Sequence, residues 1–184
     1  MIYVFLANGF EETEAVTPID ILRRCGKEVV TVGIGGSVIK GSHGIAVVTD
    51  IEDKSVELNE KLEAVVLPGG MPGTLNLEAS ETVQKALDYC TANNLYIGAI
   101  CAAPTILGHK GILNGKKAVC FTGFEKELAG AEVLDVPAVQ DGKIITSRGA
   151  GTAIEFGLKL AEALISEECS KNMGEKLLWA KSRA

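Results

Sequence analysis

The sequence predicts a flavodoxin-like, doubly wound α/β fold, in which helices cover both faces of a mostly parallel sheet. Three observations predict it. Short apolar segments of strand length recur along the 184 residues, and such continuous runs are typical of strands buried on both faces. Segments with helical periodicity alternate with them, which favours right-handed βαβ units. Glycine-bearing or polar breaks close several of the strands.

The first part of the chain predicts a strand, a helix, a second strand and a small antiparallel excursion. The helix has Ala15, Ile19 and Leu22 on one stripe, acidic residues in its first turn and Gly26 as its stop. Glycines flank the two short segments with β propensity that follow the second strand. The elements expected here are strands over residues 2–7 and 28–34, a helix over residues 11–25, and antiparallel strands over residues 38–40 and 45–49.

The parallel pattern then resumes and continues towards the end of the chain. Val83, Ala86, Leu87 and Cys90 fall at the i, i+3, i+4 and i+7 positions of one helix. The elements expected in this part are strands over residues 64–67, 96–101, 117–121, 132–139 and 143–146, and helices around residues 83–90 and over residues 103–110, 152–165 and 167–179.

The composition favours a single domain over residues 1–184 and argues against several kinds of partner. A net charge of −6 provides no basic face for nucleic acid. The opening apolar segment is short and no basic region precedes it, so it is neither a signal peptide nor a membrane span. We therefore expect a cytoplasmic protein that binds neither nucleic acid nor membranes.

The cysteines and histidines argue against a disulfide framework and against a metal site. The five cysteines are an odd number without C-x-x-C spacing, which favours reduced thiols. Neither histidine, His43 or His109, pairs with a cysteine at ligand spacing, so no metal is expected. Cys25 and Cys90 lie on apolar helical stripes and are interpreted as inert packing residues.

Four breaks are predicted to lie at one edge of the sheet. In doubly wound sheets, ligands bind in the crevice beyond the carboxyl ends of the strands. Breaks that follow different strands should therefore meet in space. They are Asn8-Gly9, Pro68-Gly69-Gly70, Cys101-Ala102 and Ser147-Arg148-Gly149.

Cys101 stands where an apolar strand changes into small residues and a proline, so it is expected at a sharp bend between a strand and a helix. The N–H groups that open the next helix would face its sulfur, lower the pKa of the thiol and hold an anion. Such a position suits a nucleophile or a redox centre. The alternative is a small packing residue at a strand end. Cys120, one predicted strand further on, either packs in the core or approaches Cys101.

Glu11, Glu12 and Glu14 follow the end of the first strand, and Glu14 is the carboxylate that we expect beside Cys101. A carboxyl group held against a thiolate should have a raised pKa. When protonated, it can donate a hydrogen bond to sulfur or to an oxygen on oxidised sulfur. The alternative is that all three glutamates only favour the start of the helix.

Gly69, Gly70 and Ala102 are the expected oxyanion and substrate-binding residues, through their backbone N–H groups. Such groups can approach a ligand only where side chains do not intervene, and together they would form an oxyanion hole. The alternative for the two glycines is an ordinary turn at a strand end, which Pro-Gly-Gly forms readily.

Taken together, these residues resemble the ThiJ/PfpI superfamily, and most closely its DJ-one branch, which is associated with Parkinson disease and deglycase activity. The resemblance spans nearly the whole chain. The motifs that carry it are Leu6-Ala7-Asn8-Gly9-Phe10-Glu11-Glu12-Thr13-Glu14, Pro18-Ile19-Asp20, Arg23-Arg24, Val65-Val66-Leu67-Pro68-Gly69-Gly70, Ala99-Ile100-Cys101-Ala102-Ala103-Pro104 and Thr146-Ser147-Arg148-Gly149-Ala150-Gly151-Thr152.

The resemblance implies that Cys101 is a nucleophile and redox centre, that Glu14 hydrogen-bonds to it, and that the protein is a homodimer without a cofactor. Members of the family are described as cofactor-free glyoxalases that convert methylglyoxal to lactate and as deglycases. Others are described as oxidative-stress sensors whose cysteine becomes a sulfinate, and as chaperones.

The chain departs from the family pattern at Phe121, which stands where several members have a histidine that serves as proton partner of the cysteine. His109 cannot easily replace that histidine, because eight residues of helix separate it from Cys101 by ~12 Å. The sequence leaves open whether His43 reaches any site. A Cys-His hydrolase triad is therefore not expected, and peptidase activity is the least favoured of the family's reactions.

Two functions remain open. In the first, the protein is a stress-protective, glutathione-independent glyoxalase or deglycase in which the Cys101 thiolate adds to a small reactive aldehyde such as methylglyoxal. Glu14 then moves the proton between adjacent carbons while backbone N–H groups hold the oxygen. In the second, the protein is an oxidative-stress sensor or chaperone whose Cys101 becomes a sulfinate stabilised by Glu14, with little turnover.

Overall fold

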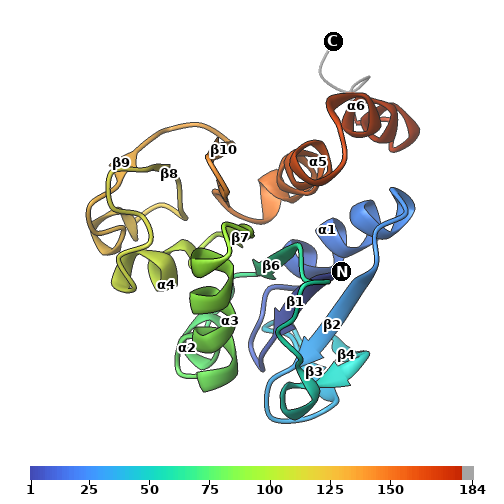
Figure 1. Cartoon of the computed structure of the whole chain (residues 1–184), viewed down its shortest axis with the longest axis vertical. Coiled ribbons are helices and arrows are strands. Elements are labelled where there is room, and N and C mark those ends of the chain that lie inside the picture. The colour runs from blue at the N-terminus through green and yellow to red at the C-terminus, as the bar shows by residue number, and fades with distance from the viewer. Residues whose placement is uncertain (180–184) are drawn as a thin grey trace.

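A central sheet organises the computed structural model, which describes residues 1–179 (Figure 1). In this part of the chain the sheet has seven strands. Every neighbouring pair is parallel except the pair at one edge, β10 with β11. In spatial order the strands are β10 (Ala138–Asp141), β11 (Ile144–Ser147), β7 (Tyr96–Ile100), β6 (Ala64–Leu67), β1 (Ile2–Leu6), β2 (Val29–Gly33) and β5 (Ile51–Glu52).

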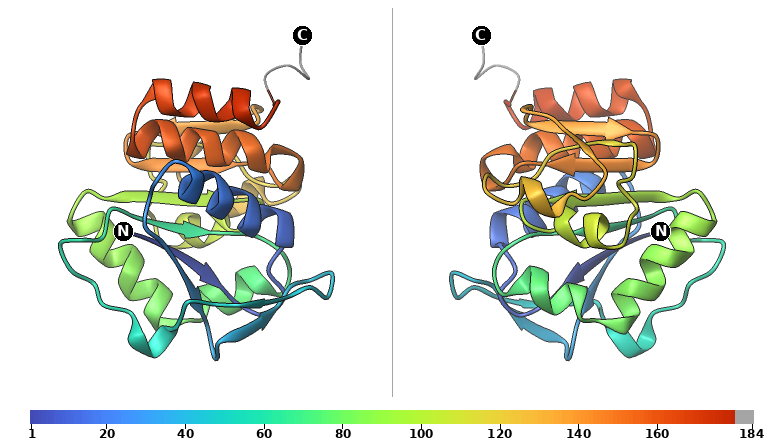
Figure 2. Two further views of the ribbon diagram at one scale, coloured as in Figure 1. Left: turned by 90° about the vertical axis from the view of Figure 1, so that its right-hand side faces the viewer. Right: turned by 90° about the vertical axis from the view of Figure 1, so that its left-hand side faces the viewer.

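Helices cover both faces of this sheet, and Figure 2 shows the resulting layers. Strand β1 is buried along its whole length and contributes to both cores. Ile2, Val4 and Leu6 pack on one face, and Tyr3 and Phe5 pack on the other. Burying each such side chain stabilises the fold by about 1.5–3 kcal/mol. The first face is covered by α1 (Glu12–Arg24), α5 (Ala153–Leu164) and α6 (Glu167–Lys176), and the second by α2 (Gly73–Glu78), α3 (Glu81–Ala92) and α4 (Pro104–His109).

Smaller elements decorate the loops. The excursion after β2 is an antiparallel pair, β3 (Val38–Lys40) with β4 (Ala46–Val48). A second small pair is parallel and joins β8 (Lys117–Ala118) to β9 (Glu132–Val133). Short 3₁₀ turns are η1 (Asp53–Ser55), η2 (Glu125–Glu127) and η3 (Ala150–Thr152).

The predicted fold class is confirmed, including the antiparallel excursion, but the region between α4 and β11 differs from the expectation. The strand expected over residues 117–121 is only β8, which lies outside the central sheet. Beyond β8, the amide of Val119 donates to the Thr146 hydroxyl at 2.9 Å and that of Phe121 donates to the carbonyl of Cys101 at 2.8 Å. The strand expected over residues 132–139 is divided at Pro137, which has no N–H to donate to a ladder.

Two other elements were not expected from the pattern. These are the short helix α2 and the edge strand β5. The last helix was expected to reach residue 179, but α6 ends at Lys176 and turns follow it. Among the described residues, no helix combines the length and the apolar character needed to cross a bilayer.

Candidate active site

The four breaks that follow β1, β6, β7 and β11 meet at one edge of the sheet. The amide of Glu11, after β1, donates to the carbonyl of Gly69, after β6, at 2.9 Å. The amide of Cys101, after β7, donates to the carbonyl of Ser147, at the end of β11, at 2.9 Å. The convergence predicted from the strand ends is therefore confirmed, and it places Cys101 and the start of α1 in one site.

Cys101 occupies a strained bend between β7 and α4. Its φ of +65° lies in the left-handed region that side chains other than glycine rarely adopt, and such strain costs about 1–3 kcal/mol. The hydrogen bonds of its backbone to Ser147 and Phe121 hold the bend. Its side chain is only partly buried. The sulfur is thereby lifted out of the sheet, as expected for a nucleophile or redox centre.

Glu14 faces this sulfur from the first turn of α1. The Glu11 carboxylate caps the helix by accepting the Glu14 amide at 2.7 Å, which fixes where the Glu14 side chain begins. That side chain is 1% exposed. Its carboxyl group hydrogen-bonds to Cys101 and accepts the N–H groups of Gly69, at 2.9 Å to Oε2, and of Ala150.

Burial raises the pKa of Glu14 to about 7, with a further contribution from the charge of Glu11. The hydrogen bonds from Cys101, Gly69 and Ala150 favour the charged carboxylate and limit the rise. The raised pKa predicted from the sequence is confirmed. A carboxyl group with this pKa can both accept and donate a proton near neutrality.

The thiol of Cys101 behaves differently from the expectation. Burial, the charge of Glu14 and the hydrogen bond to Glu14 raise the pKa of Cys101 to about 12. The N–H groups of Ala102 and Gly70 act in the predicted direction and lower it, but by less. Like charges at this distance oppose each other, so the pair holds a proton between sulfur and carboxylate. Loss of the thiol proton therefore requires an acceptor beside the sulfur, and the Glu14 carboxylate occupies that position.

The two glycines after β6 have separate roles. A Cβ atom on Gly69 would lie 2.6 Å from Cβ of Cys101 and 2.6 Å from Oε2 of Glu14, so only glycine allows the pair to meet there. The Gly69 N–H is already bound to Glu14. This leaves the N–H groups of Gly70 and Ala102, which face the sulfur, as the donors available for an oxygen on a bound substrate.

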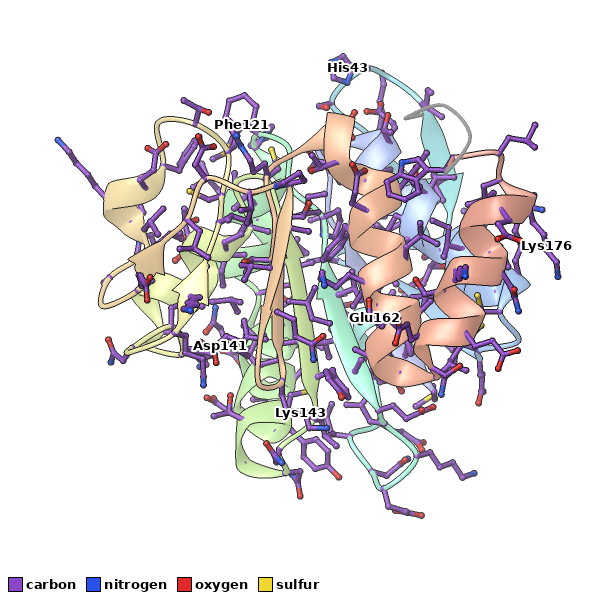
Figure 3. All side chains as sticks on the ribbon, turned by 90° about the horizontal axis from the view of Figure 1, so that it is seen from above. His43, Phe121, Asp141, Lys143, Glu162 and Lys176 are labelled. Atoms are coloured by element: carbon purple, nitrogen blue, oxygen red, sulfur yellow. The ribbon has the colours of Figure 1, made fainter. Side chains whose placement is uncertain are left out.

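Phe121 forms an apolar wall beside the pair. Its side chain is 49% exposed and lies at the same edge as His43 (Figure 3). A Cβ atom on Gly149 would lie 3.3 Å from the Phe121 ring and 3.7 Å from Glu14 Oε1, so ring and carboxylate flank that glycine. Phe124 packs edge-on against the ring at a centroid distance of 6.5 Å. The position therefore offers a hydrophobic contact and no proton carrier.

Both histidines are engaged with carboxylates. His109 ends α4 and bridges Glu78 at 2.6 Å and Glu127 at 2.9 Å. These two hydrogen bonds raise the pKa of His109. His43 Nδ1 lies 3.0 Å from Glu12 Oε2, and its side chain is 74% exposed.

One cluster among the described residues has the spacing of metal ligands. Side-chain atoms of Glu11, Glu12 and His43 all lie within 4.8 Å of one another. Burial raises the pKa of Glu12, but the hydrogen bonds from the His43 side chain and from the amides of His43 and Ile45 outweigh it and lower the pKa to about 2. Glu12 pairs with His43, and Glu11 accepts the Glu14 amide as the cap of α1, so these hydrogen bonds account for the cluster.

Cys120 packs in the core rather than pairing with Cys101. It is 5% exposed and belongs to the core that α3 and α4 cover. Burial raises the pKa of its thiol to about 11. Cys120 also lines a cavity of about 320 Å³ with Thr122 and Arg148. Cys120 and Thr122 are the neighbours of Phe121 in the sequence.

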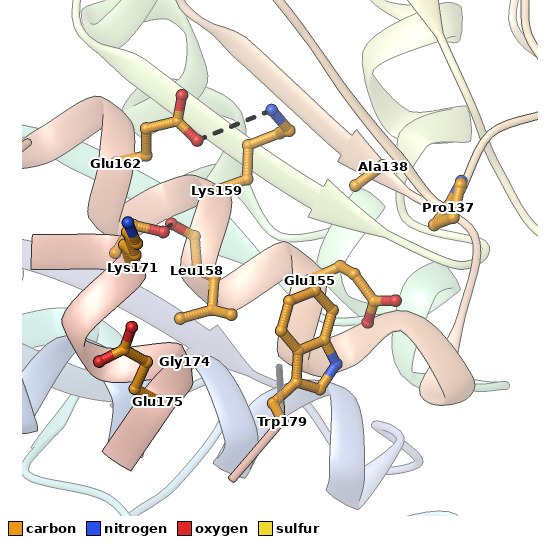
Figure 4. A pocket seen from close by; sticks show the side chains of 11 residues that line it. Pro137, Ala138, Glu155, Leu158, Lys159, Glu162, Lys171, Gly174, Glu175 and Trp179 are labelled. Carbon is orange, nitrogen blue, oxygen red and sulfur yellow. Dashed lines mark hydrogen bonds and ion pairs between the residues drawn. The ribbon is translucent and has the colours of Figure 1, made fainter. Parts of the chain in front are cut away.

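A separate cavity of about 420 Å³ lies between α5, α6 and β10 (Figure 4). Leu158 and Trp179 form part of its wall, and Lys159 and Glu162 lie on its rim 4.0 Å apart. None of the residues that hold the Cys101–Glu14 pair lines this cavity.

One functional contact was missed by sequence reasoning. The break after β11 was expected near Cys101, but the donation of the Ala150 N–H to Glu14 was not. The one sequence feature that pointed to this contact is the glycine at position 149, where the Phe121 ring and Glu14 lie close to the backbone. The direction of a single N–H group depends on the path of the loop, which has no periodic pattern.

The chain is similar to proteins of known name along almost its whole length. It is 38% identical to Protein dj-1beta of Drosophila melanogaster over 96% of each chain. It is 33% identical to the protein named glutathione-independent glyoxalase DJR-1.2 of Caenorhabditis elegans, over 93% of this chain and 91% of that one. The solved structure of oxidised DJ-1 of Toxoplasma gondii superposes with a TM-score of 0.93 at 36% identity, covering 97% of this chain and 98% of that one.

Residues 1–163 also match the DJ-1/PfpI family, and that match includes every residue assigned to the site. The chain therefore belongs to the DJ-1/PfpI family.

Proposed function

We propose that the protein is a cysteine-dependent glyoxalase that acts on small reactive aldehydes such as methylglyoxal without glutathione. The observation that carries the proposal is the hydrogen-bonded pair of Cys101 and Glu14, with the pKa of Glu14 raised to about 7. The similar protein of Caenorhabditis elegans bears the name of this activity. A stress-protective role follows, because removal of reactive carbonyls protects other proteins.

The first step joins the substrate to the protein. The Cys101 sulfur attacks the aldehyde carbon while Glu14 accepts the thiol proton, so the buried pair never carries two negative charges. The carbonyl oxygen becomes an oxyanion beside the N–H groups of Gly70 and Ala102, which stabilise it. Glu14 then returns the proton to that oxygen and is again a carboxylate.

The next steps move one proton between neighbouring carbons. Glu14 removes the hydrogen of the former aldehyde carbon, which yields an enediolate, and then protonates the adjacent carbon. As this carbon is protonated, the hydroxyl proton on the first carbon passes to the oxygen of the second carbon. The product is a thioester of lactate with Cys101. Water attacks this thioester, the C–S bond breaks, lactate leaves and the thiol is restored. Methylglyoxal and water thus give lactate with no external cofactor.

The same site supports deglycase chemistry on early adducts of aldehydes, but it does not favour amide cleavage. A peptidase must protonate a leaving amine. The two histidines of this chain are bound to carboxylates, His43 to Glu12 and His109 to Glu78 and Glu127. Phe121 contributes no proton.

Lactate formation in buffer free of glutathione tests the proposal. We expect lactate from the unmodified protein and none from Cys101→Ser, whereas Cys90→Ala should retain the activity because Cys90 is fully buried on α3. A well-folded, fully reduced protein that consumes no methylglyoxal would overturn the proposal. Equal activity in Cys101→Ser would do the same.

A second candidate function is an oxidative-stress sensor or chaperone. The observation in its favour is that the donors around the sulfur, the N–H groups of Gly70 and Ala102 and a protonated Glu14, also suit the oxygens of a sulfinate. Mild peroxide followed by peptide mass spectrometry tests it. Two oxygens should be added to Cys101 before Cys90 or Cys120 is oxidised, and equal oxidation of all three would contradict it.

We also propose that the protein is a cytoplasmic homodimer. Exposed apolar side chains support this on the β3–β4 hairpin and on α1, where Val38, Ile45, Val48 and Val16 are 49–74% exposed. Ile21, also on α1, is 1% exposed and packs in the core, so it does not belong to this surface. Light scattering should give the mass of a dimer.

The hairpin provides the variant for this test. Val38 and Val48 lie opposite each other in the β3–β4 register, so replacing both with lysine places like charges on one patch. We expect Val38→Lys with Val48→Lys to give monomers, and Leu178→Lys, at another exposed apolar position, to leave the dimer intact. A monomeric unmodified protein would refute the proposal.

A further inference from the structure

Two thiols from distant parts of the chain meet where α1 ends and α6 begins. Cys25 is the C-terminal cap of α1, and Cys169 lies in the first turn of α6. The Cys25 thiol hydrogen-bonds to the Cys169 thiol. Both side chains are partly buried rather than enclosed. Cys25 packs partly against the core, as the sequence indicated, but unlike the fully buried Cys90 it also faces another thiol.

The pair borders a cavity of about 350 Å³. Figure 1 shows the end of α1 beside α6, which is where this cavity lies. Ser166 and Glu168, on its α6 side, are exposed. A small oxidant can therefore reach the sulfurs from solvent. The residues around the pair are Arg24, Ser166, Glu168, Asn172, Met173 and Lys176.

The surroundings of the two thiols are unequal. Burial, followed by the hydrogen bond and charge of Cys169, raises the pKa of Cys25 to about 11, and the nearby Lys176 limits the rise. Cys169 occupies the first turn of α6, where its amide donates to the Ser166 hydroxyl at 3.1 Å. Because Cys25 keeps its proton at neutral pH, we assign Cys169 as the attacking sulfur and Cys25 as the sulfur that resolves the product.

We propose that Cys25 and Cys169 form a reversible disulfide when the protein meets peroxide, and that this bond fastens α6 to α1 independently of Cys101. Both residues lie at helix ends, and a Cβ atom on Gly26, directly after Cys25, would meet nothing within 4 Å, so the end of α1 has room to adjust. Cys101 differs from this pair because its hydrogen-bond partner is a carboxylate, so its oxidation adds oxygen.

The chemistry balances with hydrogen peroxide as the oxidant. The Cys169 sulfur attacks one peroxide oxygen, the O–O bond breaks, and the released hydroxide takes up the Cys169 proton to form water. The Cys25 sulfur then attacks the resulting sulfenic acid, the S–S bond forms, the S–O bond breaks and a second water leaves with the Cys25 proton. The two sulfurs are oxidised and the two peroxide oxygens are reduced. An excess of a thiol reductant reverses the bond.

The bond would change how firmly α6 is held. Without it, α6 contacts α5 through Ser170, whose hydroxyl donates to the carbonyl of Leu158 at 2.9 Å, and through buried Met173. A bond between residues 25 and 169 closes most of the chain into one loop, and cross-links that close long loops restrict the unfolded chain most.

Peptide mass spectrometry without reduction tests the proposal on the full chain. After treatment of the reduced protein with peroxide, we expect one linked species that joins the Cys25 and Cys169 peptides, with a mass two hydrogens below their sum. Dithiothreitol should remove it. The species should form equally in Cys101→Ser, and the matched variant Cys90→Ala should behave as the unmodified protein.

Single replacements and thermal unfolding complete the test. Cys25→Ser should convert Cys169 to an oxygenated form instead of a disulfide, and peroxide should raise the Tm of the unmodified protein by about 5–10 °C but not that of Cys169→Ser. The proposal is overturned if Cys25 and Cys169 remain reduced, acquire oxygen separately, or link only to other molecules while Cys101 is fully oxidised. Because none of these readouts requires aldehyde turnover, the result does not depend on the glyoxalase proposal.

Discussion

At the scale of single residues, the site depends on the absence of a side chain at position 69. A Cβ atom there would enter the space between Cys101 and Glu14, 2.6 Å from both. We therefore expect Gly69→Ala to lower the rate of lactate formation by about 10²-fold, because small displacements of reacting groups have effects of that size.

Gly151→Ala is the matched control for this prediction. Position 151 follows the Ala150 contact to Glu14, but a Cβ atom there meets nothing within 4 Å. The variant should keep its full activity, as measured in the same lactate assay. If Gly69→Ala were as active as Gly151→Ala, the close approach of Cys101 and Glu14 would not matter for catalysis.

The individual residues of the site differ in how well the sequence predicts them. Cys101 and Glu14 could be placed because both follow apolar strands of a parallel sheet, whose ends share one edge. The separate roles of Gly69 and Gly70 could not be predicted. They depend on the direction of each N–H group, since that of Gly69 points to the Glu14 carboxylate and that of Gly70 to the Cys101 sulfur. The rise in the pKa of Cys101 was missed because the effect of burial exceeds that of the helix N–H groups.

At the scale of elements, the close contact of α1 with α5 rests on Gly157. A Cβ atom on this residue would lie 2.6 Å from Cδ1 of Ile21 and 3.2 Å from Cα of Pro18. Alanine favours a helix over glycine by about 1 kcal/mol, whereas overpacking costs about 1–3 kcal/mol. The two effects oppose each other at this position.

Gly174→Ala, on α6, separates helix propensity from overpacking. A Cβ atom at this position makes only ordinary contacts of 3.5 and 3.7 Å, so the variant gains helix propensity without crowding. In denaturant titrations we expect Gly157→Ala to be less stable than Gly174→Ala by about 1–3 kcal/mol. If Gly157→Ala and Gly174→Ala were equally stable, α1 and α5 would be able to move apart without a cost in the free energy of unfolding.

Elements with a strong period were predicted well, and elements fixed by tertiary contacts were not. The apolar runs of β1, β6 and β7 and the stripes of α1, α3 and α5 identify these elements directly. Residues 119–121 read as a strand, yet their amides bond to the Thr146 side chain and to the bend at Cys101 instead of a ladder. The local sequence pattern does not indicate these hydrogen-bond partners, because they lie far away in the sequence.

At the scale of the whole molecule, Glu14 makes stability depend on pH. Its pKa rises from 4.5 to about 7 on folding, so the folded state binds the proton more tightly. The stability that this provides is fully present below about pH 4.5 and is lost as the pH rises through 7, an effect of about 3 kcal/mol for this 1%-exposed group.

Glutamine does not titrate. As the pH rises from 4.5 to 8, the free energy of unfolding of the unmodified protein should therefore fall by about 3 kcal/mol relative to that of Glu14→Gln. Carboxylates with lowered pKa values, such as Glu12 and Asp50, lose their stabilising effect as the pH falls, but equally in both proteins. Denaturant unfolding at several pH values measures the difference. A difference that does not change with pH would contradict the raised pKa.

The layered architecture was predictable from the alternation of strands and helices, since a parallel sheet needs crossover helices. The antiparallel edge strand β10 was not, because only the turn at Gly142, with a φ of +60°, reverses the chain there. The meeting of Cys25 with Cys169 also arises at this scale, from the packing of the first helix near the last described one.

The pH dependence of lactate formation tests the central claim, that Glu14 carries the proton for Cys101, most directly. For the unmodified protein, kcat/KM should rise with pH to a plateau above about 7, as the Glu14 carboxylate becomes available. In Glu14→Gln it should be about 10²–10⁴-fold lower and should lack this rise. A Glu14→Gln protein that keeps the plateau rate, or the same inflection near pH 7, would contradict the account.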